Sequence, residues 1–391
     1  MNTLIAFDKF KDALTAREVC EVAKQAIQTS HPDWKIETAP LADGGDGFCD
    51  TLTGAIDGEF FRTTATAPLG GNVETIFGIV SIDSIREEAK ELLQFSGETK
   101  RVAIIEMAQS SGIALLSHKE RTPWKTTTFG LGELMKAGAE KGAEATVIGL
   151  GGSATHDLGL GALQALGFNF LDKNGSPLSA FPSPEAWPSI ESIRVPSESR
   201  LQNLQIRIAC DVENPLLGKN GAAAIFGPQK GLKPEDYDRL ESLTERTARL
   251  LCETMNADSA TAMSSPGAGA AGGTALGLNV ALGGVIVPGF ELVKKWIGLE
   301  EKLNAVDQVL TGEGRFDRSS FQGKGPGSLV RDALALGKKV HVFAGSVDSS
   351  IEQDSDTFFI NAISPENMPL TEALRNTKSL LAESVSKTFN V

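Results

Sequence analysis

Cysteine and histidine are scarce and scattered in this sequence of 391 residues. The four cysteines, Cys20, Cys49, Cys210 and Cys252, form no C-x-x-C pair, and the four histidines are equally dispersed. Disulfide frameworks and zinc sites need closely spaced cysteine and histidine ligands, so neither is expected here. The sequence also lacks any run of lysine and arginine, and its formal net charge is −13. Binding to nucleic acid or to an anionic membrane is therefore not expected.

Long hydrophobic runs are absent too, apart from one uncharged segment between Asp258 and Glu291. That segment is rich in glycine and alanine, contains Pro266 and Pro288, and has no flanking cluster of lysine or arginine. We therefore expect a buried loop and helix there, and not a membrane span. The apolar residues before Asp8 are too few for the core of a signal peptide, so a cytoplasmic protein is predicted.

Several well-known catalytic motifs are missing as well. The sequence contains no G-x-x-x-x-G-K-[ST] phosphate loop, no protein-kinase signature set, no H-E-x-x-H and no G-x-S-x-G. The segment GAGAAG at 267–272 matches the dinucleotide motif G-x-G-x-x-G, but Ser-Ser-Pro at 264–266 precedes it where a strand is required. It gives only weak support to one alternative, a nicotinamide-dependent hydroxy-acid dehydrogenase. The missing signal peptide and the paired acidic loops disfavour another, a non-catalytic two-lobed anion-binding protein of the cell envelope.

The length suggests two or three domains, and the pattern of apolar runs indicates how they are arranged. Five runs of strand length lie near the two ends of the chain: TLIAF at 3–7, KIETA at 35–39, VDQVL at 306–310, KKVHVFA at 338–344 and TFFI at 357–360. Apolar residues at helical spacing follow the first run, and Thr15 and Glu18 form a capping box there. We predict an α/β protein in which residues 1–58 and 290–391 form a doubly wound parallel-sheet domain, interrupted by a second α/β domain at 59–289.

Charged residues and glycines follow four of these five predicted strands. They are Asp8 and Lys11, then Asp43, Gly44, Gly45 and Asp46, then Gly312, Glu313, Gly314, Arg315 and Asp317, and lastly Gly345 and Ser346. The carboxyl ends of parallel strands share one edge of a sheet, so these residues are expected to lie together. Glycine lets backbone N–H groups approach phosphate, and carboxylates suit Mg²⁺. The joint pattern predicts a site for a polyanion and a metal, although a turn explains each single glycine equally well.

The middle of the chain adds two candidate segments. A predicted strand leads into Gly-Gly-Ser at 151–153, before a predicted helix whose exposed N–H groups would attract an anion. Asp157 would lie beside them as a metal ligand or base. Another predicted strand, 206–209, is followed by Asp211, a candidate general base or metal ligand. Alternatively, the small residues around 151–153 serve tight helix–strand packing, and Asp211 closes a turn. The residues alone thus predict a two-domain α/β enzyme acting on phosphate or another small anion with Mg²⁺.

Nine segments, in order along nearly the whole chain, resemble the glycerate kinase family of bacterial type. They are DKFKDALTA from Asp8, PLADGGDGF from Pro40, IEMAQSSGIALL from Ile105, TTTFGLGELMKAG from Thr126, IGLGGSATHDLGLG from Ile148, ACDVENPLLG from Ala209, FGPQKG from Phe226, PGAGAAGG from Pro266 and LTGEGRFDRSSFQGKGPG from Leu310. The resemblance implies a kinase that phosphorylates D-glycerate with ATP, preferentially to 2-phosphoglycerate. It also implies a flavodoxin-like (Rossmann-like) domain interrupted by a second α/β domain, with the active site in the cleft between them.

The sequence departs from the family pattern at four positions. Lys9 replaces serine, Phe48 replaces a small or hydroxyl residue, His156 replaces asparagine and Leu158 replaces glycine. These departures concern the substrate preference more than the class of reaction.

Under this resemblance, roles follow from charge, because phosphoryl transfer needs mainly positioning and charge neutralisation. Lys11 and Arg315 would hold the glycerate carboxylate or the γ-phosphate, while Asp157 or Asp211 would orient the attacking hydroxyl. The expected Mg²⁺ ligands are Asp43, Asp211 and Glu313. The expected ATP contacts are Gly151, Gly152, Ser153, Gly312, Glu313 and Lys324, and Asp8 completes the catalytic set. The expected partners are D-glycerate and ATP, with no nucleic acid or membrane; a homodimer stays open.

Overall fold

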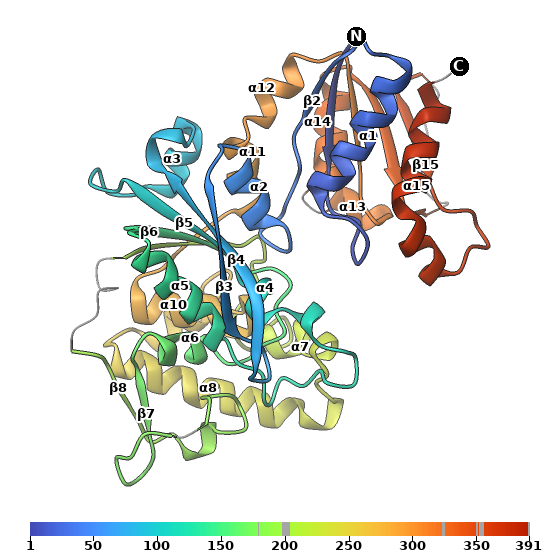
Figure 1. Ribbon diagram of the computed structural model, residues 1–391. Coiled ribbons are helices and arrows are strands. Elements are labelled where there is room, and N and C mark those ends of the chain that lie inside the picture. The colour runs from blue at the N-terminus through green and yellow to red at the C-terminus, as the bar shows by residue number, and fades with distance from the viewer. Residues whose placement is uncertain (179, 198–203, 323–324, 349–350, 352–355, 390–391) are drawn as a thin grey trace. The chain divides into compact units, whose positions relative to one another are not determined.

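The computed structural model describes the whole chain except residues 179, 198–203, 323–324, 349–350, 352–355 and 390–391. The chain forms two compact units. The first unit consists of Met1–Asp43 and Val293–Val391, and the second unit consists of Gly44–Leu292. Each unit contains parallel strands and helices (Figure 1), so the prediction of a mixed α/β protein is confirmed.

The two units meet in the sequence at 43/44 and 292/293, whereas the sequence pattern suggests 58/59 and 289/290. Helix α2 (Phe48–Gly54) explains the difference at the first boundary. This helix packs against β4 (Asn72–Ser81) and β5 (Arg101–Glu106), both of which belong to the second unit. Its burial therefore places the residues after Asp43 with the middle of the chain.

The first unit is built on a sheet of five parallel strands in the order β15-β13-β11-β1-β2. These strands are β1 (Asn2–Phe7), β2 (Lys35–Thr38), β11 (Gln308–Gly312), β13 (Lys339–Ala344) and β15 (Phe358–Ala362). All five predicted strands are thus present. The apolar runs of the three inner strands β1, β11 and β13 are buried, a pattern typical of parallel strands, whereas the edge strands β2 and β15 are more exposed.

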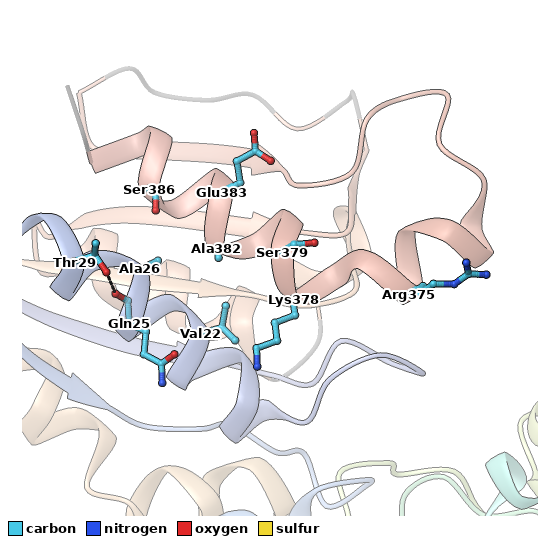
Figure 2. Close-up of a pocket in the computed structure, with 10 residues that line it drawn as sticks. All are labelled: Val22, Gln25, Ala26, Thr29, Arg375, Lys378, Ser379, Ala382, Glu383 and Ser386. Carbon is cyan, nitrogen blue, oxygen red and sulfur yellow. Dashed lines mark hydrogen bonds between the residues drawn. The ribbon is translucent and has the colours of Figure 1, made fainter.

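Helices α1 (Ala16–Ser30) and α15 (Leu370–Phe389) pack against each other in the first unit. The predicted capping box at the start of α1 is present, because Thr15 Oγ1 accepts from the Glu18 N–H and the Glu18 carboxylate accepts from the Thr15 N–H. Buried residues of both helices join Ile5 and Phe7 of β1 in one core cluster. Each such fully buried side chain stabilises the fold by about 1.5–3 kcal/mol. Figure 2 shows an open groove between α1 and α15.

The second unit has a sheet of six strands in the order β10-β9-β6-β5-β4-β3. Strand β3 (Glu59–Thr66) pairs antiparallel with β4, and β4 pairs antiparallel with β5. The other three, β6 (Ala145–Gly149), β9 (Gln205–Ala209) and β10 (Val285–Val287), continue the sheet in parallel with β5. Strands β3 and β4 thus form an antiparallel pair at one edge of an otherwise largely parallel sheet.

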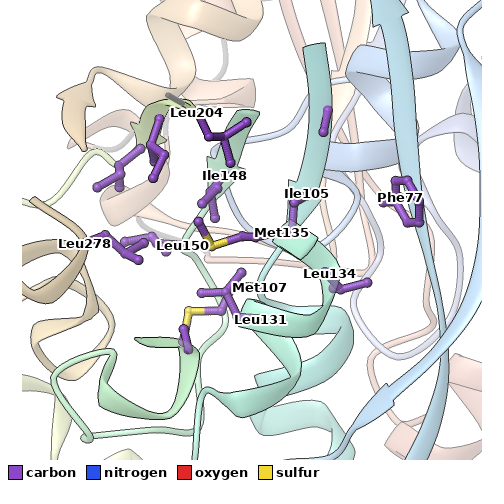
Figure 3. Packing of buried hydrophobic residues seen from close by; sticks show 14 of the residues in the cluster. Phe77, Ile105, Met107, Leu131, Leu134, Met135, Ile148, Leu150, Leu204 and Leu278 are labelled. Carbon is purple, nitrogen blue, oxygen red and sulfur yellow. The ribbon is translucent and has the colours of Figure 1, made fainter. Parts of the chain in front are cut away.

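Helix α5 (Phe129–Glu140) covers part of this sheet. Figure 3 shows Leu131, Leu134 and Met135 of α5 in one cluster with Ile105 of β5 and Ile148 of β6. Glycines on α5 allow close approach to α6 (Leu160–Ala165), because a Cβ at Gly132 would collide with the backbone of Ala162. The small residues of this segment are therefore required by packing.

The uncharged segment forms α9 (Ser259–Ser264), α10 (Ala270–Leu282) and β10. Most residues of α10 are buried, which confirms the expected buried loop and helix. In the described part of the chain no helix has both the length and the apolar character needed to cross a membrane. A helix, and not a strand, precedes GAGAAG at 267–272, so the structural context of a dinucleotide-binding motif is missing there.

The remaining α-helices and strands include the 18-residue helix α8 (Tyr237–Thr254), which contributes buried residues to a core cluster of the second unit. The others are α3 (Glu87–Leu93), α4 (Ala108–Ser111), α7 (Ala222–Phe226), α11 (Gly289–Trp296), α12 (Leu299–Asn304), α13 (Arg318–Gln322), α14 (Pro326–Ala335), β7 (Asn169–Leu171), β8 (Ser192–Arg194), β12 (Arg315–Phe316) and β14 (Ser346–Val347).

Candidate active site

The carboxyl edge of the first unit's sheet contains a reversal of strand order. The chain passes from β1 outward to β2, whereas from β11 it passes outward in the other direction to β13 and β15. Asp8 follows β1 and Glu313 follows β11, and the Asp8 N–H donates to the Gly312 carbonyl oxygen at 3.1 Å. In open α/β sheets, ligands bind in the crevice at such a reversal.

A cavity of about 900 Å³ opens at this edge. Five residues predicted for catalysis, metal or ATP line it together: Asp8, Lys11, Asp43, Glu313 and Arg315. Gly345 and Ser346, which follow β13, also line it. These residues therefore lie together as expected, although they are far apart in the sequence. Gly44, Gly45 and Asp46, expected at the same edge, belong to the second unit.

Two glycines bring the backbone segments at this edge into close contact. Gly312 has a φ of +152°, and a Cβ there would overlap the carbonyl oxygen of Phe343 in the neighbouring strand β13. A Cβ at Gly345 would likewise press on the carbonyl oxygen of Gly314. Gly312 therefore serves close strand packing, since only glycine fits there without displacing β13.

Burial and neighbouring carboxylates raise the pKa of Asp8 and of Glu313. Burial raises the pKa of Asp8 to about 7, the ammonium group of Lys9 opposes this, and the charges of Asp43 and Glu313 add to the increase. Lys9 Nζ lies 3.8 Å from Asp8 Oδ1. Burial also raises the pKa of Glu313, against a hydrogen bond with Ser320. Clustered carboxylates of this kind are typical of sites that bind a cation or transfer a proton.

Arg315 differs from these residues because its side chain is 73% exposed. Its Nε lies 3.1 Å from Oδ2 of Asp317, so the guanidinium group is held at the mouth of the cavity by this neighbour. Arg315 and Ser346 are paired in the short β12–β14 ladder. An exposed guanidinium at a cavity mouth can contact an arriving anion without first being dehydrated.

In the second unit, the loop that contains residues 151–153 packs against the loop at residues 44–47. The Gly151 N–H donates to the Gly44 carbonyl oxygen at 2.9 Å, and a Cβ at Gly151 would collide with the backbone of Gly45. Gly152 has a φ of +72°, and a Cβ there would lie 2.8 Å from Oδ1 of Asp46. Packing therefore explains both glycines, and an anion-binding role for this loop stays a prediction.

Lys230 is a buried residue that sequence reasoning did not place in the site. Its side chain is 2% exposed, and its Nζ donates to Ser153 Oγ at 2.8 Å and to the Thr155 carbonyl oxygen at 2.7 Å. Burial lowers the pKa of Lys230 to about 7, while the carboxylate of Asp157 partly opposes this effect. The only available signal was the motif FGPQKG, since the contact with Ser153 spans 77 positions.

Glu106 is a second residue missed by sequence reasoning. It ends β5, and its Oε2 accepts from the N–H groups of Gly47 at 3.0 Å and Cys49 at 3.2 Å, at the start of α2. Burial raises the pKa of Glu106 to about 7, and the nearby Asp46 carboxylate contributes to this increase. Glu106 thus fixes the loop against which Gly151 packs.

Asp157 is fully buried and is held by four donors. Its Oδ2 accepts from Thr128 N at 2.7 Å, Thr128 Oγ1 at 2.8 Å and Gly161 N at 3.2 Å, and its Oδ1 accepts from Gly159 N at 3.2 Å. Burial raises the pKa of this carboxyl, against these hydrogen bonds. The contacts are those of a structural residue that joins the start of α5 to the start of α6, and its predicted catalytic role has no support from them.

Asp211 follows β9 as predicted, and its Oδ2 accepts from the Phe290 N–H at 2.8 Å at the start of α11. This contact is a helix cap, so the carboxylate already has a local structural function. His156 is also buried, with its Nε2 3.0 Å from Thr244 Oγ1, and burial lowers its pKa to about 3. Leu158 has a φ of +56°, a conformation that explains why glycine is usual at this position.

Within the described residues, no three histidine, cysteine, aspartate or glutamate side chains come together as a ready-made metal site. Mg²⁺ in phosphoryl-transfer enzymes is nevertheless held by only one or two carboxylates together with substrate phosphates and water. Asp43 and Glu313 line the same cavity and supply hard oxygen ligands, so the residues present fit such an ion. Lys324, predicted to contact ATP, lies outside the described residues.

Comparison with known proteins agrees with the motifs. The model of the "Glycerate kinase family" matches residues 3–391. A glycerate kinase of Halalkalibacterium halodurans is 34% identical over 389 residues, which cover 98% of this chain and 96% of the relative. A glycerate 2-kinase of Escherichia coli is 36% identical over 352 residues, or 90% of this chain and 87% of the relative. A crystal structure from Salmonella typhimurium, described as a candidate glycerate kinase 2, superimposes with a TM-score of 0.76 at 34% identity, covering 99% of this chain and 97% of that one.

Proposed function

This chain belongs to the glycerate kinase family, and we propose that it transfers the γ-phosphate of ATP to the 2-hydroxyl group of D-glycerate. The hydroxyl oxygen forms a bond to the γ-phosphorus, the bond from this phosphorus to the bridging oxygen breaks, and the hydroxyl proton passes to a base. The products are 2-phosphoglycerate and ADP. One observation carries the proposal beyond family membership: a single cavity at the strand-order reversal is lined by several acidic and basic side chains. Those described are Asp8, Asp12, Asp43, Glu313 and Glu366 on the acidic side and Lys9, Lys11 and Arg315 on the basic side.

Lys11 and Arg315 neutralise the anionic oxygens of the substrates. Both line the cavity, and the Arg315 side chain is largely exposed and can fold over a bound anion. Guanidinium groups bind carboxylate or phosphate through two parallel hydrogen bonds, which fixes the orientation as well as the charge. Lys11 acts as a point charge beside it.

Asp8 is the preferred acceptor for the hydroxyl proton. It directly follows β1 at the reversal and lines the same cavity as Lys11 and Arg315. Asp211 is the second candidate, because it also follows a parallel strand, in the second unit. Asp157 is not preferred, since all its contacts are internal.

Asp43 and Glu313 would hold Mg²⁺ by their carboxylates. When bound, the ion would neutralise part of the charge on the β- and γ-phosphates. Asp211 was also predicted as a ligand, and its Oδ2 accepts from the Phe290 N–H. The set proposed here consists of Asp43 and Glu313, the two predicted ligands that line the cavity.

The second unit contributes the loop of Gly151, Gly152 and Ser153, which we propose contacts phosphate while Lys230 holds Ser153 in place. Gly312 positions Glu313 by allowing close strand packing, and Lys324 is kept as a proposed ATP contact. For the fold, we propose the finer description of a doubly wound, flavodoxin-like first unit into which the second unit is inserted. A cytoplasmic location is part of the same proposal.

A coupled assay of ADP formation with D-glycerate and ATP, followed by phosphorus NMR of the product, tests this function. The expected result is glycerate-dependent ADP release and a single product with phosphate on the 2-hydroxyl. Phosphate on the 3-hydroxyl would contradict the regiochemistry, and ADP release that does not depend on glycerate would contradict the substrate. A parallel mixture with NADH is expected to show no change in absorbance.

A further inference from the structure

The geometry points to a specific orientation of the nucleotide in the first unit's cavity. We infer that the triphosphate lies at the β1–β11 end, beside Lys11 and Arg315, and that the purine base lies at the other end, against the start of α15 and the loop before it. This inference rests on the proposed use of ATP.

The cavity follows the carboxyl edge of the sheet across several strands. Its lining residues include Asp8 after β1, Glu313 after β11, Ser346 after β13, and Ala362 at the end of β15. The strand order β15-β13-β11-β1 separates the two ends by three strand spacings. At about 4.8 Å per spacing, the cavity spans roughly 14 Å, which suits an extended nucleoside triphosphate and far exceeds a three-carbon acid.

The two ends of the cavity differ in chemistry. Among the described residues, the lysine and arginine side chains that line it are Lys9, Lys11 and Arg315, and they come from segments after β1 and β11. Six of the nine described lining residues near α15 are apolar: Ala362, Pro365, Met368, Leu370, Ala373 and Leu374. The other three are Ser364, Glu366 and Thr377, and no lysine or arginine is among the nine. A ligand that matches both ends must be highly charged at one end and flat or apolar at the other, and a nucleotide has this distribution.

Leu370 is the strongest sign of a ligand at the apolar end. This first residue of α15 is 73% exposed, the largest value among the exposed large hydrophobic residues of the described chain. It borders the cavity together with the half-buried Met368 and Leu374. An exposed leucine at the rim of a partly apolar cavity gains favourable burial when a base covers it. Glycerate has no comparable apolar surface.

The substitution Leu370→Asp tests this orientation. Position 370 is exposed and lies in the first turn of a helix, where aspartate is favourable, so the variant is expected to fold. A carboxylate beneath the base would replace apolar contact and should weaken ADP binding, measured by calorimetry with magnesium chloride present, by about fivefold or more. The KM for ATP should rise in parallel, while the KM for D-glycerate should stay within about twofold.

Ser379→Asp is the matched control. Ser379 is exposed on the same helix, but it lines the separate groove between α1 and α15 (Figure 2). This variant should bind ADP like the parent protein. A second test variant, Met368→Ala, should weaken ADP binding in the same direction as Leu370→Asp, without adding charge.

The outcomes separate this inference from the proposed function. Unchanged ADP affinity in both Leu370→Asp and Met368→Ala would overturn the orientation, even if the parent protein phosphorylates glycerate. If Ser379→Asp weakens ADP binding as much as Leu370→Asp does, the orientation is also overturned, because any added negative charge would then have the same effect. Weakened ADP binding in the two test variants only, in a protein that does not phosphorylate glycerate, would support the orientation and refute the proposed substrate.

Discussion

Lys230 donates a hydrogen bond of 2.8 Å to Ser153, and both side chains are buried. The same ammonium group donates to the Thr155 carbonyl oxygen, so one side chain fixes two positions of the segment that follows Gly152. Ser153 is also paired with Gly112 in an isolated bridge. This segment is therefore held from both sides, which is what a preorganised binding loop requires.

The first prediction concerns Lys230 and pH. Its pKa of about 7 in the folded protein lies below the ordinary value of 10.5, so the unfolded chain binds more protons between these values. Stability should therefore rise with pH across this window. We expect the free energy of unfolding of the parent protein, measured with urea relative to that of Lys230→Met, to increase between pH 7 and pH 9.5. This increase should be on the order of 3 kcal/mol. If the difference in unfolding free energy between the two proteins does not change with pH, the lowered pKa of Lys230 is refuted.

Glu106 should show the opposite dependence. Its pKa of about 7 lies above the ordinary 4.5, so the folded protein binds more protons between these values, and stability should fall as pH rises through this range. Glu106→Gln keeps an acceptor for the Gly47 and Cys49 N–H groups but cannot ionise. Between pH 5.5 and pH 8, the parent protein should lose on the order of 2 kcal/mol relative to this variant. If the difference in unfolding free energy between the parent protein and Glu106→Gln is the same at pH 5.5 and pH 8, Glu106 does not cause the loss of stability.

Alanine substitutions at Gly312 and Gly314 test the close packing at the carboxyl edge of the first unit's sheet. A Cβ at Gly312 would overlap Phe343, whereas at Gly314 the nearest atom would be the Lys11 nitrogen at 3.5 Å, an ordinary contact. Gly312→Ala should therefore destabilise the first unit by about 2 kcal/mol or more and lower activity, while Gly314→Ala should cost less than half as much. Denaturant unfolding measures both. Equal effects would mean that close packing at Gly312 does not position Glu313.

Measurements of kcat can decide whether Asp8 or Asp211 accepts the hydroxyl proton. A residue that accepts the hydroxyl proton supplies roughly a hundredfold or more to the rate. We expect Asp8→Asn to lower kcat by at least that factor. Asp211→Asn keeps an oxygen that can cap α11 and should lower kcat by less than about tenfold. A larger loss of kcat in Asp211→Asn than in Asp8→Asn would identify Asp211 as the proton acceptor.

The proposed metal ligand Glu313 should control the magnesium requirement. Removing one of two carboxylates weakens binding of a hard cation, so Glu313→Gln should raise the magnesium concentration for half-maximal rate by about tenfold. Glu366→Gln, in the same cavity but after β15, is the control and should leave this concentration unchanged. An unchanged requirement in Glu313→Gln would remove this residue from the ligand set.

Local sequence pattern was sufficient to predict the first unit's sheet and the residues at its edge. The runs around Ile5, Val309 and Val342 are short, apolar and followed by glycine or charge, and parallel pairing then forces their ends together. Glu106 and Lys230 could not be found in this way, because their contacts span 59 and 77 positions. A lysine in a glycine-rich segment gives no sign that it will be buried.

The role of Asp157 illustrates the other difficulty. Its neighbourhood in the sequence suggests an anion site, but the donors that hold its carboxylate include Thr128, 29 positions away. Whether a polar residue faces a ligand or the interior depends on such distant donors. For Asp211, the observed hydrogen bond from the Phe290 N–H is a structural contact, and its role as a metal ligand or base stays a prediction.

A crystal structure of the protein with ADP, magnesium chloride and D-glycerate would locate the nucleotide directly. We expect phosphates beside Lys11 or Arg315 in the cavity of the first unit, with the base on Leu370. Density for ADP bound away from that cavity would contradict this placement.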